Sequence, residues 1–93
     1  MALCKEIELP NGQIGKYHII DQILELNYET KYCSVILASY STKESFELGE
    51  KFVDRNRQTY TNEDFIFDET QDIEPQLYVK LIEKGLFKDA AEC

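Results

Sequence analysis

The stretch that decides the fold is residues 31–40, which read KYCSVILASY. With the period of two that a β-strand imposes, apolar side chains fall on both sides of this stretch. One side carries Tyr32, Ile36, Ala38 and Tyr40, and the other carries Cys33, Val35 and Leu37. The pattern therefore predicts a strand that is buried on both faces or covered by a partner subunit.

The preceding run, residues 13–28, satisfies two periodicities. It alternates as a strand would, but Ile19, Ile20, Ile23, Leu24 and Asn27 also follow the three-and-four spacing of an amphipathic helix. No N-cap residue precedes the run, it is rich in Ile and Tyr, and a tight link at 27–30 leads into the central strand. A strand is the favoured prediction, and the helix stays open as the alternative.

The N-terminal residues 5–9 predict a further strand. Ile7 and Leu9 alternate with glutamates there, and the following Pro10-Asn11-Gly12 is typical of a tight turn.

The residues after the central strand predict a helix and then a last strand. Ser41-Thr42-Lys43-Glu44 matches the capping box, so a helix is expected from there to about residue 53, although Gly49 disfavours it. Residues 54–58 are polar and predict a link, and residues 59–68, rich in Tyr, Thr, Phe and Ile, predict the last strand.

The clearest helix is expected over residues 72–84. Pro75 is tolerated in a first turn, and Gly85 supplies a left-handed stop. The whole chain, residues 1–93, is thus predicted to be one α+β domain. Its core is an antiparallel meander of about four strands, with a helix inserted before the last strand and a C-terminal helix.

Composition limits the partners of the protein. The 93 residues hold 10 Lys and Arg against 18 Asp and Glu, which gives a net charge of −8. Nucleic acid and anionic membranes are not expected partners, because both require a local excess of cations. No run is long and apolar enough to span a bilayer or to direct secretion, so we expect folding in a cytosol.

Three cysteines, Cys4, Cys33 and Cys93, lie far apart in the sequence. They form neither an even disulfide framework nor a metal-binding pair, so all three are predicted to be reduced thiols. Cys33 is expected to be a small core residue.

No residue pattern indicates catalysis, a metal, a cofactor or a small-molecule substrate. His18 is the only histidine, and we expect it to be structural; its pairing with Cys33 across neighbouring strands is the one enzymatic alternative. The acidic stretch 63–74 lacks the ligand spacing of a calcium loop, since Phe65, Ile66 and Phe67 fill its middle.

Tyrosines are the most plentiful contact residues. The chain has 6 of them, more than so small a core can hold, and tyrosine is enriched in protein interfaces. Half-exposed sheet residues are one interpretation; the other is an interface for self-association or docking. The candidate interface residues are Tyr17, Tyr28, Tyr32, Tyr40 and Tyr60.

Several short segments resemble a family of small proteins encoded by phages and prophages of Gram-positive bacteria, in or beside the tail and lysis genes. The segments are MAL (1–3), KEIEL (5–9), NG (11–12), YH (17–18), ILASY (36–40), LYVKL (77–81) and FKDA (87–90). The family has a basic residue where this chain has Cys4, and it brings no catalytic residues.

The resemblance implies a non-enzymatic structural or accessory protein of the tail module. Such a protein would self-associate and contact other phage proteins in the host bacterial cytoplasm, and it could be assembled into the virion. The alternative, from the charge of −8, is an acidic inhibitor or DNA mimic that binds a basic host protein.

Overall fold

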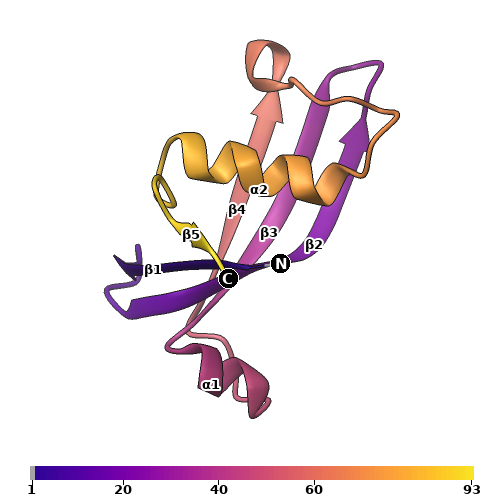
Figure 1. The fold of residues 1–93 in the computed structure, drawn as a ribbon. Coiled ribbons are helices and arrows are strands. Elements are labelled where there is room, and N and C mark those ends of the chain that lie inside the picture. The colour runs from indigo at the N-terminus through magenta and orange to yellow at the C-terminus, as the bar shows by residue number, and fades with distance from the viewer. Residues whose placement is uncertain (1) are drawn as a thin grey trace.

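A computed structural model describes residues 2–93 and shows one antiparallel sheet with two α-helices (Figure 1). The strand order is β4-β3-β2-β1-β5. The strands are β1 (Leu3–Glu8), β2 (Ile14–Asn27), β3 (Tyr32–Tyr40), β4 (Asp54–Thr61) and β5 (Ala91–Glu92), and the helices are α1 (Lys43–Glu47) and α2 (Ile73–Glu83). The predicted α+β architecture on an antiparallel sheet is confirmed. The described residues contain five strands rather than about four, because β5 follows α2.

Strand β2 is the middle strand of the sheet and β3 lies beside it, which resolves the ambiguity of residues 13–28 in favour of the strand. One face of β3 lies beneath α2, which crosses the sheet (Figure 1). The core between them contains Cys33, Val35 and Leu37 from β3 with Leu77, Tyr78, Leu81 and Phe87 from α2 and the segment after it. These seven side chains are almost fully buried, so this layer supplies most of the hydrophobic stabilisation.

The opposite face of β3 is covered by side chains of the neighbouring elements. Arg57 Nε donates a hydrogen bond of 2.7 Å to Ser34 Oγ, and Arg55 forms an ion pair of 2.9 Å with Asp21 across the strand. At one end of this face Phe46 of α1 packs against Tyr17 and Tyr40, with ring centroids 5.2 and 5.0 Å apart. β3 is therefore covered on both sides, as its sequence predicts, within a single chain.

The predicted bounds of the last meander strand were wrong. Residues 54–58, expected to be a polar link, form most of β4, and residues 62–68, expected to be strand, leave the sheet through a short 3-10 turn at Asn62–Asp64. β4 pairs with β3 only, and its side chains alternate between exposed and half-buried up to Tyr60. Ladder hydrogen bonds need no apolar side chains, so a polar segment can form an edge strand.

The helix expected to reach residue 53 is only five residues long. Thr42 is its N-cap, and Thr42 Oγ1 accepts a hydrogen bond of 3.1 Å from Ser45 N. Gly49 adopts a φ of +77°, which suits a helix stop, and Leu48 is 76% exposed. Leu48 thus has no surface to pack against, and short helices depend on such packing. Val53 packs against the core from the segment after the helix.

The chain ends meet, because β5 lies beside β1 in the sheet. Cys4 and Cys93 form a disulfide with their Cα atoms 6.0 Å apart, so the prediction of three reduced thiols was wrong for these two. Their separation of 89 residues hides this contact in the sequence. Cys33 is a free, buried thiol as predicted, and burial raises its pKa.

Candidate interaction surface on the free edge of β2

Strand β2 has a neighbour on both edges along only part of its length. β1 pairs with it from Ile14 to His18, whereas β3 pairs with it from Tyr17 to Asn27. Residues 19–27 therefore have a strand partner on one edge alone. An antiparallel strand directs its N–H and C=O groups to both sides, so the other edge of this segment presents unpaired backbone groups. We call residues 20–27, seen from that side, the β2 free edge.

A tyrosine from α2 caps the start of the β2 free edge. Ile20 N donates a hydrogen bond of 2.8 Å to Tyr78 Oη, two residues beyond His18, the last residue of β2 that pairs with β1. Burial raises the pKa of Tyr78, which keeps the phenol neutral. Tyr78 thus takes the place of a strand partner for one backbone group. It is the one side chain or backbone group of residues 2–93 that hydrogen-bonds this edge.

Two irregularities bend β2 along the free edge. The pairing register with β3 shifts at Asp21 and again at Leu24, each of which is an extra residue opposite the partner strand. Such bulges increase the local twist and turn side chains away from regular alternation. As a result Ile23 and Leu24 are 37% and 43% exposed, although both are aliphatic residues of a sheet.

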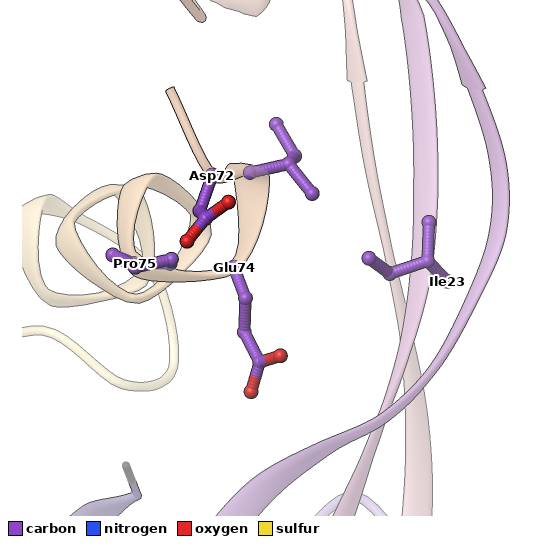
Figure 2. Close-up of a pocket in the computed structure, with 5 residues that line it drawn as sticks. Ile23, Asp72, Glu74 and Pro75 are labelled. Carbon is purple, nitrogen blue, oxygen red and sulfur yellow. The ribbon is translucent and has the colours of Figure 1, made fainter. Parts of the chain in front are cut away.

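A hollow of about 420 Å³ separates the middle of the β2 free edge from the first turn of α2. Its lining residues are Ile23, Asp72, Ile73, Glu74 and Pro75. Figure 2 shows Ile23 on the strand facing the helix across the gap, with the carboxylates of Asp72 and Glu74 on the helix side. α2 begins here because Asp72 takes the N-cap position and Pro75 fits the first turn. The hollow is therefore apolar at its strand and helix walls and acidic at its rim.

A second hollow, of about 390 Å³, lies at the far end of the free edge beside the loop that leads to α2. Its lining residues are Tyr28, Lys31, Phe65, Phe67, Asp68, Glu69 and Thr70. Three of them pack edge to face, with ring centroids 5.7 Å apart for Tyr28 and Phe65 and 5.0 Å apart for Phe65 and Phe67. Ile23 and Tyr28 are five residues apart in the sequence, with the bulge at Leu24 between them and Tyr28 in the turn after β2.

The five tyrosines predicted as an interface do not lie on one surface. Tyr17 and Tyr60 are buried within the chain, each 8% exposed. Tyr40 packs on Phe46, and Tyr32 Oη accepts a hydrogen bond of 3.3 Å from Arg57 at the other end of β3. Of the five, Tyr28 alone lines a hollow at the free edge. What the sequence analysis missed was the pair Ile23-Leu24, whose adjacent aliphatic residues break the alternation and signal a bulge.

His18 has a structural environment. The carbonyl of Lys5 can only accept, so His18 Nε2 donates to it over 2.9 Å, and Nδ1 then accepts from Ser39 Oγ over 2.7 Å. Burial lowers the pKa of His18, and the hydrogen bond to Lys5 opposes this shift. His18 pairs with Ser39, whereas Cys33 pairs with Leu26, six positions along β3. The two side chains are thus roughly 20 Å apart, and the Cys33–His18 pairing is wrong.

Within residues 2–93 no group of three or more His, Cys, Asp or Glu side chains is placed to hold a metal ion. In the same range no helix is long and apolar enough to cross a membrane. Comparison of the chain with protein-family models, with curated proteins and with solved structures finds no match.

Proposed function

We propose that this protein is a non-enzymatic structural or accessory component of a phage or prophage tail module that acts through protein–protein contacts. The observation that carries the proposal is the β2 free edge, where unpaired backbone groups lie beside two exposed aliphatic side chains. Exposed apolar surface next to an open strand edge is typical of a contact site. The sequence resemblance supports the phage context, in which the protein is made in the host bacterial cytoplasm and can be assembled into the virion.

The rest of the fold suits a rigid contact module. Its helix and central strands share one well-packed core, and His18 uses both ring nitrogens inside the fold. A module of this kind would present a preformed edge and lose little conformational entropy on binding. Self-association and contacts with other tail proteins are both included in the proposal.

Mass spectrometry of purified particles and of assembly intermediates tests the proposal, using a host strain that carries the gene. We expect the polypeptide in one or both fractions. Its absence from both would refute the tail-module function. Light scattering behind size exclusion, at two protein concentrations, tests self-association, and a monomer at both concentrations would remove that part of the proposal.

An acidic inhibitor of a basic host protein is the second candidate. The observation that favours it is the excess of carboxylates. Four cations are already in ion pairs within the fold: Lys16 with Glu6, Arg55 with Asp21, Lys80 with Glu83, and Lys84 with Asp64. The net charge of −8 thus resides in carboxylates that face solvent. Recovery of a basic nuclease or polymerase from host lysate at low salt would support this candidate, and recovery of none would exclude it.

A further inference from the structure

We infer that the β2 free edge binds an extended segment of a partner protein, in which apolar and basic residues alternate, as an added strand of the sheet. This inference deepens the proposed function, on which it rests, by naming the surface and the chemistry of its partner.

The backbone supplies the first part of the argument. A strand added beside residues 20–27 would continue the row that β1 occupies beside residues 14–18. It would pair with backbone groups that no other element of residues 2–93 satisfies, apart from the N–H of Ile20. Main-chain hydrogen bonds of this kind provide affinity in strand addition, and side-chain pockets provide specificity.

The two hollows supply the pockets. The first, at Ile23, offers Ile73 and Pro75 as apolar walls, and the second, at Tyr28, offers aromatic rings. They lie at Ile23 and Tyr28, five residues apart in the sequence, so an extended segment of about eight residues is long enough to span both. Side chains on one face of such a segment recur at every second position, so a row of apolar residues on the face toward α2 places several of them near the hollows.

The charges supply the preference for a basic partner. Asp72 and Glu74 line the first hollow, and Asp68 and Glu69 line the second. Glu25 is exposed on the strand between them. Against these acids the two hollows contain a single cation, Lys31. The acids at the two hollows and Glu25 surround the path of the added strand with negative charge, so a segment that carries Lys or Arg is attracted to it, which increases both the rate and the specificity of binding.

A second copy of this chain is a poor occupant of the edge. Two β2 free edges pairing with each other would bring Asp21 and Glu25 of one copy close to those of the other, and like charges opposite one another destabilise a sheet. The other long edge, β4, carries Arg55 and Arg57, but these side chains reach back over β3 to Asp21 and Ser34. On its other face β4 presents Asn56 and Gln58, which would not fill apolar hollows.

The experiment uses the full chain and a capped synthetic peptide of about eight residues in which Val and Lys alternate. Binding is followed by amide chemical shifts and by hydrogen exchange. We expect shift changes and slowed exchange at residues 20–27, and at least about tenfold weaker binding when Glu replaces every Lys. No binding at about 1 mM peptide, or changes confined to another element, would overturn the inference.

The variant Ile23→Arg fills the first hollow and offsets its acidic rim, so it should weaken peptide binding by at least about tenfold. Val79→Arg is the matched control, because Val79 is also an exposed aliphatic residue, at 51% against 37%, and lines neither hollow. Both sites face solvent, so both variants should fold. Equal binding by Ile23→Arg and the wild type would overturn the inference.

The two proposals can fail separately. If the chain is present in particles but the peptide does not bind, the strand-addition inference fails and the tail-module function stands. If the peptide binds at the β2 free edge but the chain is absent from particles and intermediates, the tail-module function fails and the binding site stands.

Discussion

Opening the Cys4–Cys93 disulfide should lower the stability of the protein substantially. The bond joins residues 89 positions apart, so it constrains almost the entire unfolded chain. Loop-closure entropy for such a separation gives about 4.6 kcal/mol at 25 °C, and measured effects of native disulfides start near 2 kcal/mol. Reduction also gives the folded state some freedom, because β5 pairs with β1 at only two positions and can fray. This freedom offsets part of the loss in the free energy of unfolding.

The predicted loss is therefore about 2 to 4.6 kcal/mol of unfolding free energy, which corresponds to a fall in Tm of roughly 10 to 30 °C for a domain of this size. The assay is denaturant unfolding followed by circular dichroism, with and without a reductant. The double variant Cys4→Ser, Cys93→Ser is the control, and its unfolding midpoint should not respond to the reductant.

A thiol titration in denaturant gives an independent reading of the same bond. Without reductant, Cys33 alone should react, since it is the free cysteine, and all 3 cysteines should react after reduction. Reaction of three thiols in the unreduced protein would refute the pairing of the chain ends. An unfolding midpoint that reductant leaves unchanged would refute the argument from loop closure.

Three further predictions concern the sheet. Tyr78→Phe leaves the Ile20 N–H without its acceptor and should cost about 1 to 3 kcal/mol in denaturant unfolding; a change below about 0.5 kcal/mol would count against the role of this phenol. Gly15→Ala places a Cβ 3.0 Å from Leu9 Cδ1 in a buried site and should destabilise the protein by about 1 to 3 kcal/mol, whereas Gly12→Ala has space but a φ of +86° and tests strain alone. The lowered pKa of His18 means that the unfolded chain takes up a proton first as pH falls. The contribution of neutral His18 to the free energy of unfolding is complete above pH 6.5, declines as the pH falls below 6.5, and levels off below the pKa of the folded state. The free energy of unfolding of a His18→Gln variant should lack this decline.

The central part of the fold was predictable because its signals are local. The alternating stretch 31–40 and the β-branched run before it encode β3 and β2, and Gly85, with a φ of +87°, follows directly after the extended C-cap Lys84 that ends α2. Helix α2 spans Ile73–Glu83, close to the predicted 72–84. In each case the residues that carry the pattern are also the residues that are buried or conformationally restricted.

The errors occurred where long-range contacts decide the structure. β4 is polar because it is an edge strand, and its pairing with β3 is visible only in three dimensions. The disulfide depends on β5 reaching β1, a contact that spans the whole chain. The candidate site was missed for the same reason, since it lies on the part of β2 beyond its pairs with β1. The number of tyrosines could not indicate the β2 free edge, because this surface is defined by backbone groups without a strand partner among residues 2–93.

The way the other sheet edges are closed strengthens the argument for a single contact site. β4 has charged and polar side chains, which discourage edge-to-edge pairing, and β5 is two residues long and covalently tied to β1. Tyr78 Oη accepts the hydrogen bond of the first backbone donor of the β2 free edge, Ile20 N, and bonds no further group of that edge. Among residues 2–93, the segment from Asp21 to Asn27 has two bulges and the charges of Asp21 and Glu25, yet it is the long edge that carries an exposed aliphatic pair. A sheet with its apolar contact surface on one edge can accept one added strand there without polymerising through its other edges.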